Sequence, residues 1–319
     1  MSRHPLITPQ SKIYVAGHNG MVGSAIVRHL RRKGFHNVLT RSRHELNLLD
    51  QSAVNRFLAS ETPDFIFLAA AKVGGIQANN TERAAFLYEN LTIQTNIIHG
   101  AWRAGIHQLL FLGSSCIYPR DCPQPIAEDS LLTGPLEQTN EPYAIAKIAG
   151  IKLCESYNHQ YGTRFISAMP TNLYGPNDNY DLATSHVLPA LIRKAHEAKV
   201  NKAEKLILWG SGEPRREFLH VDDVADACLF LMQADHPPDI VNIGVGKDLP
   251  IRELAELIKQ IVGCSCTITY DLSKPDGTPQ KLLDVSRMKN YGWTAKISLE
   301  EGLRSTYAAY KALLSKDKV

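Results

Sequence analysis

Short apolar runs alternate with longer amphipathic stretches through the first half of the chain. One run, at 65–71, has no polar residue at alternate positions, which is typical of a strand covered on both faces. Strand–helix alternation of this kind predicts an α/β fold with a doubly wound parallel sheet. We expect strands at 12–17, 37–41, 65–71, 108–115 and 164–170, and helices at about 22–33, 51–60, 80–104 and 142–161.

The regular alternation of apolar runs and amphipathic stretches ends at Gly175 and Pro176. The predicted helices beyond this point lie at about 186–199, 222–233, 250–262 and 298–314, and the predicted strands at 205–209, 241–244 and 267–271. A chain of 319 residues has room for about two domains. We therefore expect a sheet domain over 1–176 and a smaller C-terminal α/β substrate domain over 177–319. Segment 217–245 is left open as a possible return to the first sheet.

The first predicted strand runs directly into a glycine-rich loop with the spacing GxxGxxG, made of Gly17, His18, Asn19, Gly20, Met21, Val22 and Gly23. Glycines at such a strand-to-helix turn let the backbone approach a pyrophosphate and pack the helix closely on the strand. A glycine-rich turn without a ligand is the alternative. The strand before the loop and the helix after it favour a Rossmann-type dinucleotide site lined by these seven residues.

The end of the second predicted strand indicates which dinucleotide binds. NAD sites usually place Asp or Glu there to bind the ribose 2′-hydroxyl. This chain has no carboxylate at that strand end and instead carries Arg41 and Arg43. A guanidinium pairs well with a phosphate, so the two arginines favour NADP(H). Solvated loop charges are the alternative for both.

A serine, a tyrosine and a lysine form the candidate catalytic group. Ser114 ends the fourth predicted strand, and Tyr143 and Lys147 lie one helical turn apart on one face. In this interpretation Ser114 bonds a substrate carbonyl, Tyr143 exchanges a proton as hydride moves, and Lys147 lowers the pKa of Tyr143 and reaches a ribose. For the Tyr143 and Lys147 pair taken alone, the alternative is a surface tyrosine and a surface lysine without a catalytic role.

Together these features resemble the extended short-chain dehydrogenase/reductase superfamily, and within it the GDP-L-fucose synthases. The similar motifs cover essentially the whole chain: GHNGMVGSA from Gly17, LAAAKVGGI from Leu68, LGSSCIYP from Leu112, NEPYAIAK from Asn140, PTNLYGP from Pro170, WGSG from Trp209, REFLHVDD from Arg216 and SKPDGTP from Ser273. The resemblance implies an NADPH-dependent enzyme that epimerises C3 and C5 of GDP-4-keto-6-deoxy-D-mannose and then reduces C4. Its members commonly form homodimers.

The resemblance also implies residue roles. Cys116 is the base and His186 the acid of epimerisation, although a lone cysteine or histidine is otherwise more often structural. His186 also contacts the cofactor, as does Lys147, and the nicotinamide end is lined by Pro170, Thr171, Asn172 and Leu173. The GDP-sugar is held by Lys194, Trp209, Arg216 and Lys281. Two positions depart from relatives that carry arginine there, namely Asn19 and Lys194.

Composition limits the other readings. Lys plus Arg exceeds Asp plus Glu by only three, so net charge favours neither a nucleic-acid nor a membrane partner. Six cysteines without a CxxC pair predict no metal site, and a chain this long needs no disulfides. With no apolar leader at the N-terminus, we expect a cytoplasmic enzyme. A nucleotide-sugar dehydratase or 4-epimerase that holds NAD, and a nucleotide-sensing regulator, are the alternatives.

Overall fold

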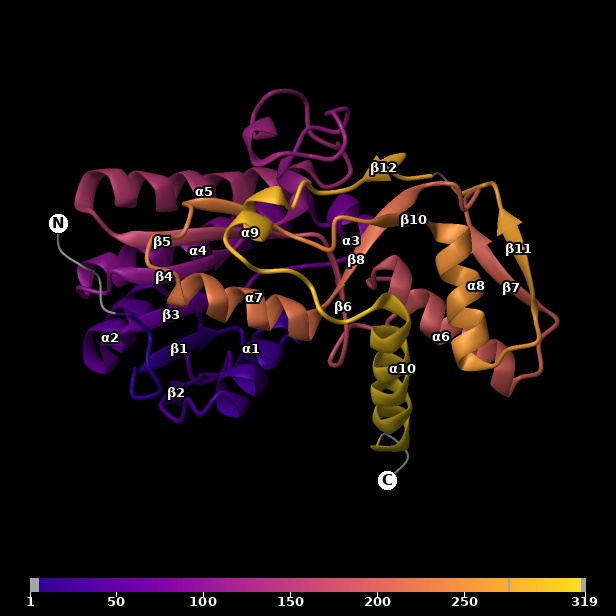
Figure 1. The fold of residues 1–319 in the computed structure, drawn as a ribbon, viewed down its shortest axis with the longest axis horizontal. Helices are drawn as coiled ribbons and strands as arrows, with labels where there is room; N and C mark the ends of the chain where they lie inside the picture. Colours follow the sequence, from indigo (N-terminus) through magenta and orange to yellow (C-terminus); the bar gives the residue numbers. More distant parts are fainter. Residues whose placement is uncertain (1–5, 275, 317–319) are drawn as a thin grey trace.

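A six-stranded parallel sheet, built mainly from the first half of the chain, forms the centre of one part of the molecule. The structure is a computed structural model that describes residues 6–274 and 276–316, so the N-terminal five residues and Pro275 of the SKPDGTP motif lie outside the described residues. The strand order is β2 (Val38–Leu39), β1 (Ile13–Ala16), β3 (Phe65–Leu68), β4 (Gln108–Leu112), β5 (Arg164–Pro170) and β9 (Ile240–Ile243). The predicted Rossmann-type fold class is confirmed (Figure 1).

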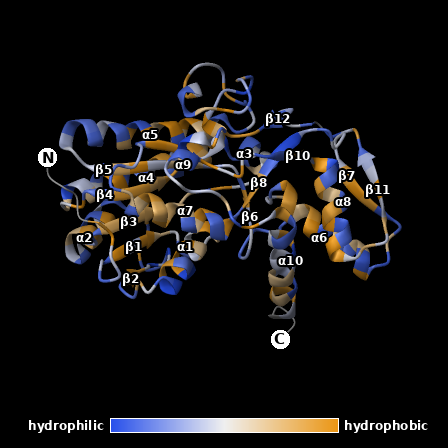
Figure 2. Cartoon of the chain, in the orientation of Figure 1, coloured by the Kyte–Doolittle hydropathy of each residue, from blue (hydrophilic) through white to orange (hydrophobic). Residues whose placement is uncertain are grey.

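Helices cover both faces of this sheet, and the strand side chains alternate between them. Phe65 and Phe67 face a core shared with α1 (Met21–Arg32) and α7 (Val221–Gln233). Ile66 and Leu68 face the opposite core, shared with α2 (Gln51–Glu61), α4 (Arg83–Arg103) and α5 (Glu141–Tyr161). Figure 2 shows the hydrophobic strands enclosed between these helices. A strand buried on both faces needs apolar residues at successive positions, which explains the unbroken run at 65–68.

The remaining elements build a separate apolar cluster beside the sheet. It lies between α6 (Val187–Val200), α8 (Ile251–Val262) and α10 (Leu299–Lys316), with β7 (Lys205–Trp209) and β11 (Thr267–Asp271) paired in parallel. Strand β8 (Arg215–His220) pairs with β6 (Asn172–Tyr174), β10 (Asp248–Pro250) and β12 (Gln280–Lys281). These elements occupy the right of Figure 1.

The longer helices fall where the sequence pattern predicts them, but among the described residues six short strands and α-helices were not predicted. They are β6, β8, β10, β12, α3 (Ile76–Thr81) and α9 (Ser286–Asn290). β8 begins with two arginines and a glutamate, and their polarity hides its strand periodicity. β9, from the segment left open at 217–245, pairs in parallel with β5 at the sheet edge.

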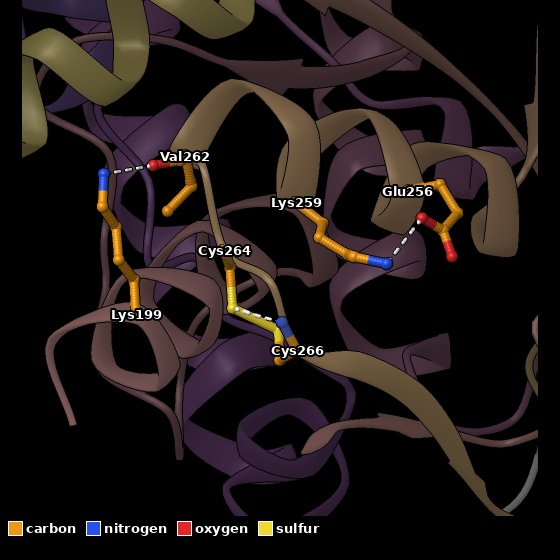
Figure 3. The surroundings of a disulfide bond; sticks show 6 residues. All are labelled: Lys199, Glu256, Lys259, Val262, Cys264 and Cys266. Carbon is orange, nitrogen blue, oxygen red and sulfur yellow. Dashed lines mark hydrogen bonds and ion pairs between the residues drawn. A yellow bond between two sulfur atoms is a disulfide. The ribbon is translucent and has the colours of Figure 1, made fainter. Parts of the chain in front are cut away.

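The cysteines differ from expectation at one place. Cys264 and Cys266 form a disulfide in the turn after α8, whereas no bridge was predicted (Figure 3). Both are buried in the cluster beneath α8, and the Lys199 ammonium donates to the Val262 carbonyl beside them at 2.7 Å. The reason for the difference is local: a CxC turn brings the two residues together whatever the size of the core. Cys154 and Cys228 are buried apolar residues, as expected.

Over 6–274 and 276–316, no helix is both long and apolar enough to cross a membrane. The same residues hold no group of three or more His, Cys, Asp or Glu side chains that could bind a metal ion.

Candidate active site

The glycine loop joins β1 to α1, and its backbone leaves no room for side chains at two positions. Gly17 has φ +86° and lies against the Ala70 backbone, where a Cβ would come within 2.7 Å. A Cβ on Gly23 would lie 2.1 Å from the Gly17 carbonyl oxygen. The His18 Nδ1 atom is buried without a hydrogen-bond partner among the described residues. Bare backbone at a helix start, with an orphaned polar atom beside it, fits a bound dinucleotide pyrophosphate.

The two predicted phosphate-binding arginines after β2 differ in their surroundings. The Arg41 Nη2 atom forms an ion pair with Glu61 Oε1 at 2.8 Å, and its guanidinium lies 5.3 Å from the Phe57 ring centre. Arg43 is exposed to solvent. The structure therefore leaves Arg43 as the more open cation, while Arg41 already shares its charge with a carboxylate on α2. The sequence did not predict this partner, which is 20 residues further along the chain.

Ser114 and Tyr143 come together at the carboxyl end of β4. Ser114 caps the short 3-10 helix at Ser115–Ile117, where its Oγ accepts from the Cys116 amide at 3.3 Å. Tyr143 lies in the first turn of α5 and shares a hydrogen bond with Ser114. Burial raises the pKa of the Tyr143 phenol, negative charge on Cys116 raises it further, and the bond to Ser114 acts in the opposite direction.

Lys147 lies one turn further along α5 and is almost fully buried. Its Nζ atom donates to the Leu112 carbonyl at 2.7 Å and lies 5.7 Å from the Tyr143 ring centre. Desolvation lowers the pKa of this ammonium to about 7. That Lys147 lowers the pKa of Tyr143 stays a prediction, because burial, Cys116 and Ser114 are the influences on the Tyr143 phenol in this structure. A buried lysine with one carbonyl partner fits a site that receives an anionic, hydroxyl-bearing ligand.

Cys116 faces two donors across the same opening. The Asn140 Nδ2 atom is 3.3 Å from its Sγ, and the Lys281 Nζ atom is 3.8 Å away. Lys281 and Arg216 are register partners on the parallel strands β12 and β8, so their side chains leave the sheet on the same side. Burial lowers the pKa of Arg216, and negative charge on Cys116 acts in the opposite direction. The structure thus brings a catalytic candidate and two substrate-binding candidates together.

His186 immediately precedes α6 and makes no capping hydrogen bond there. Its side chain is open to solvent, yet nearby protein atoms still desolvate the ring and lower the pKa of the imidazole. The positive charge of Lys281 acts in the same direction. Lys281 therefore interacts with both of the groups predicted to move protons during epimerisation.

The other two predicted sugar-nucleotide residues form a group of their own. The Lys194 Nζ atom lies 4.7 Å from the Trp209 ring centre, and Lys274 covers the same ring at 5.3 Å. Trp209 is 52% exposed, so a flat face remains open for stacking. The next turn is tied to Asp276, which accepts from the Ser211 amide at 2.9 Å and also favours the charged form of Arg216.

The segment Pro170 to Leu173 leaves the sheet at the end of β5, next to β4. Thr171 Oγ1 and Asn172 Nδ2 both donate to the Glu217 carbonyl, at 3.3 and 2.9 Å. The Glu217 carboxylate is fully buried and accepts from the Val245, Gly246 and Leu283 amides. Through its backbone carbonyl and its carboxylate, Glu217 therefore holds together the strand ends that carry the predicted nicotinamide contacts and Lys281.

Two residues of this site were missed in the sequence. Asn140 contacts Cys116 and lies three positions before Tyr143, a spacing that puts it on the same helix face. That spacing was available as a signal. Glu217 was hidden inside the REFLHVDD motif, and its three backbone partners come from segments at 245–246 and 283. No local pattern predicts such contacts.

Known proteins resemble this chain along most of its length. A family model for the NAD dependent epimerase/dehydratase family matches residues 13–244. GDP-L-fucose synthase 1 of Arabidopsis thaliana is 58% identical over 300 residues, which cover 94% of this chain and 93% of that relative. GDP-L-fucose synthase of Escherichia coli K12 is 55% identical, with 93% and 96% covered. The crystal structure of a GDP-L-fucose synthetase from Naegleria fowleri bound to NADP is 26% identical, with a TM-score of 0.89 and 99% and 97% covered.

Proposed function

The chain belongs to the NAD dependent epimerase/dehydratase family, and from this premise we propose that it converts GDP-4-keto-6-deoxy-D-mannose to GDP-L-fucose with NADPH. It does so as a bifunctional 3,5-epimerase and 4-reductase, and the relatives named GDP-L-fucose synthase support the product. The observation that carries the proposal is the meeting of Ser114, Tyr143 and Lys147 with Cys116, whose sulfur faces Lys281.

Epimerisation uses the acidity that the C4 ketone gives to the protons on C3 and C5. Cys116, as thiolate, removes one of these protons. The hydroxyls of Ser114 and Tyr143 donate to the C4 oxygen and stabilise the resulting enolate. His186, as imidazolium, then delivers a proton to the opposite face of the carbon and inverts it. Two groups on opposite sides of the ring are required because one group can only return the proton to the face it came from.

Reduction follows at the same carbonyl. NADPH, when bound, supplies the hydride that adds to C4. Tyr143 donates its proton to the C4 oxygen as the alcohol forms, and Ser114 keeps that oxygen in place. Lys147 holds the cofactor ribose. Anionic cofactor groups favour its ammonium form, which then stabilises the phenolate left on Tyr143. The cofactor phosphates are held by the Gly17–Gly23 loop, Arg43 and Arg41, with Asn19 a weaker contact than arginine.

The nucleotide end of the substrate is held by cations and one aromatic face. Arg216 and Lys281 bind its phosphates, and Lys194 and Trp209 hold the nucleoside. The segment from Pro170 to Leu173, together with His186, would hold the nicotinamide end of the cofactor. A surface that recognises two polyanions needs only local positive charge, which accords with a net charge of +3.

We also propose the arrangement of the chain beyond the site. Residues 1–176, with 217–245, form the cofactor domain, and the remainder of 177–319 forms the substrate domain. The enzyme is a homodimer in the cytoplasm, paired through α4 and α5. The support for pairing is that these helices carry exposed large apolar side chains, namely Tyr88, Ile145 and Tyr161.

One assay tests the proposed function. The purified protein is incubated with GDP-4-keto-6-deoxy-D-mannose and NADPH in deuterated water, and the product sugar is identified by NMR. We expect NADPH consumption, GDP-L-fucose as product and deuterium at C3 and C5. A 4-epimerase or dehydratase would consume no NADPH, and a regulator would only bind. A Cys116→Ser variant should lose deuterium incorporation more than NADPH binding; deuterium exchange at the parent rate would remove Cys116 as the base.

A further inference from the structure

Asn140 occupies the N-cap of α5 but does not cap the helix. Asparagine is among the preferred N-cap residues because its side-chain oxygen accepts from a backbone amide of the first turn. Here no side-chain capping bond forms, and the helix begins with Asn140 in a non-helical conformation at φ −127° and ψ 13°. By contrast, Asp50 at the N-cap of α2 accepts from the Ala53 amide at 3.0 Å. The amide of Asn140 is therefore directed elsewhere.

The Asn140 amide is directed at the sulfur of Cys116. Its Nδ2 atom donates to Sγ at 3.3 Å, and its Oδ1 atom is buried without a hydrogen-bond partner among the described residues. An amide kept for structural reasons normally has both ends bonded, because a buried polar atom without a partner is costly. One bonded end facing a reactive group and one orphaned end are characteristic of a site that a ligand completes.

The charged and titratable groups around this sulfur come from three elements. Lys281 on β12 approaches to 3.8 Å, Arg216 on β8 interacts with its charge, and Tyr143 on α5 does the same. The two cations attract negative charge at this sulfur, but their long flexible side chains do not fix where the sulfur lone pairs point. A hydrogen-bond donor on a short side chain fixes the direction of a lone pair and also stabilises negative charge on the sulfur. The reason is that a thiolate accepts hydrogen bonds readily and a neutral thiol accepts them weakly.

We propose that Asn140 is a positioning residue for epimerisation, which orients Cys116 and holds it as the thiolate that removes the C3 and C5 protons. The start of α5 then serves both reactions: Asn140 orients the base of epimerisation, and Tyr143, one turn later, is the proton donor of reduction. The proton-abstraction step rests on the proposed function, whereas the coupling between Asn140 and Cys116 does not depend on it.

The coupling is tested without substrate, by alkylation of Cys116 with iodoacetamide from pH 5 to 9. The protein is the full chain carrying Cys122→Ser, and peptide mass spectrometry follows modification at Cys116. Asn140→Ser keeps a preferred N-cap residue and removes the amide, Asn140→Ala removes both, and Asn140→Asp replaces the donor with a negative charge. We expect alkylation at pH 7 to slow about tenfold in the Ser and Ala variants, and further in the Asp variant.

Asp50→Ala is the matched control, since it removes a genuine capping bond from another helix of the same sheet. It should lower the melting temperature and leave the alkylation profile unchanged. In the ketosugar assay, the Asn140 variants should lose at least tenfold in deuterium incorporation while the dissociation constant of NADPH stays within twofold. Alkylation profiles of Asn140→Ser and Asn140→Ala that coincide with the parent profile would overturn the proposal. Failure of the parent itself to incorporate deuterium would overturn the proposed function instead.

Discussion

At the scale of single residues, burial decides the charge state of the catalytic candidates. Lys147 donates to the Leu112 carbonyl, and among the described residues no carboxylate acts on it, so desolvation dominates and brings the pKa of its ammonium to about 7. Tyr143 is affected in the same way, since burial raises the pKa of its phenol. Without a bound anion, both groups therefore favour their neutral forms at pH 8. Cofactor binding should therefore change the protonation state of Lys147 before that of Tyr143.

Proton uptake on cofactor binding follows from the state of Lys147. At pH 8 a group with a pKa of about 7 is mostly neutral, and an anionic cofactor that raises this pKa draws a proton from the buffer. We expect close to one proton per site, and an NADPH affinity that falls as the pH rises above 7. Calorimetric titration in phosphate and Tris at pH 8 measures the uptake. Lys147→Met should abolish it, and equal uptake in variant and parent would refute the assignment.

The two arginines after β2 should contribute unequally to NADPH binding. Arg41 is already paired with Glu61 at 2.8 Å, whereas Arg43 is exposed. A charge-assisted hydrogen bond to phosphate contributes about 1.5–3 kcal/mol, so Arg43→Ala should weaken NADPH binding by roughly 10- to 100-fold. Arg41→Ala should cost less, and neither change should affect NADH. Fluorescence titration with both cofactors gives the four constants; a larger loss for Arg41→Ala would reverse the ranking.

At the scale of elements, periodicity predicted the helices well and the strand ends poorly. Helices such as α1 and α8 have an apolar face that repeats within the segment itself, so their positions could be predicted locally. Strand β8 could not, because its arginines and glutamate are stabilised by β6, β10 and β12, which lie far away in the sequence. The glycine loop was predictable because its constraint is local: Gly23 must pack on Gly17.

Two alanine substitutions in the glycine loop should separate folding from cofactor binding. A Cβ on Gly23 would lie 2.1 Å from the Gly17 oxygen, so Gly23→Ala should lower the free energy of unfolding by about 1–3 kcal/mol. A Cβ on Gly20 would lie at an ordinary 3.4 Å with φ −77°, so Gly20→Ala should fold normally and lose NADPH affinity. Urea denaturation and NADPH titration measure the two effects. Equal stability of both variants would contradict this division.

At the scale of the whole molecule, the sequence predicted which residues form the site but not how they meet. Ser114, Tyr143 and Lys147 could be assigned from motif order, since they follow the sheet strand by strand. The contact between Lys281 and Cys116 spans 165 positions and depends on the register of β12 with β8. The buried Glu217 maintains that register by binding the Leu283 amide. Such contacts follow from packing, which a linear pattern does not encode.

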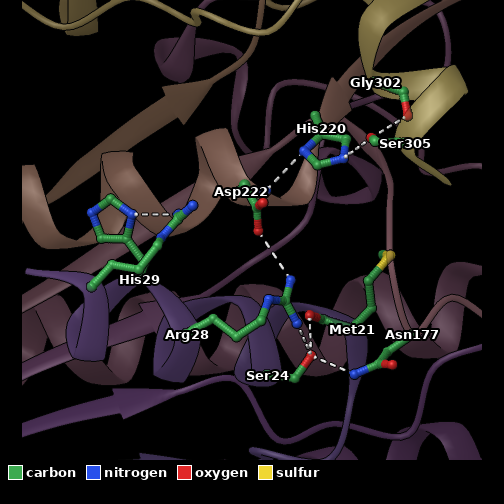
Figure 4. A network of polar contacts seen from close by, with 10 residues as sticks. Met21, Ser24, Arg28, His29, Asn177, His220, Asp222, Gly302 and Ser305 are labelled. Carbon is green, nitrogen blue, oxygen red and sulfur yellow. Dashed lines mark hydrogen bonds and ion pairs between the residues drawn. The ribbon is translucent and has the colours of Figure 1, made fainter. Parts of the chain in front are cut away.

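A polar network connects α1, the helix after the glycine loop, to α10 through the junction of β8 and α7 (Figure 4). Arg28 on α1 pairs with Asp222 at 3.0 Å, and the Asp222 amide donates to His220 Nδ1 at 3.2 Å. His220 Nε2 lies 3.4 Å from Ser305 Oγ on α10. Because Nδ1 accepts a hydrogen bond, the neutral ring carries its proton on Nε2, and a second proton would break the contact with the Asp222 amide.

Acid should therefore weaken the protein through this network. Burial lowers the pKa of His220, with Arg28 acting in the same direction and Asp222 and Glu301 opposing it. Below about pH 6.5 the unfolded chain binds a proton that the folded one resists, so the free energy of unfolding falls as the pH drops, by up to about 1.4 kcal/mol per pH unit for one such group. His220→Asn keeps a capping acceptor without the titration. Urea denaturation at pH 7.5, 6.5 and 5.5 should show a smaller fall in the free energy of unfolding for this variant than for the parent. His29 and His186, whose pKa values are also lowered, are present in both proteins and so do not affect the comparison. Parallel stability curves would show that the acid sensitivity resides elsewhere.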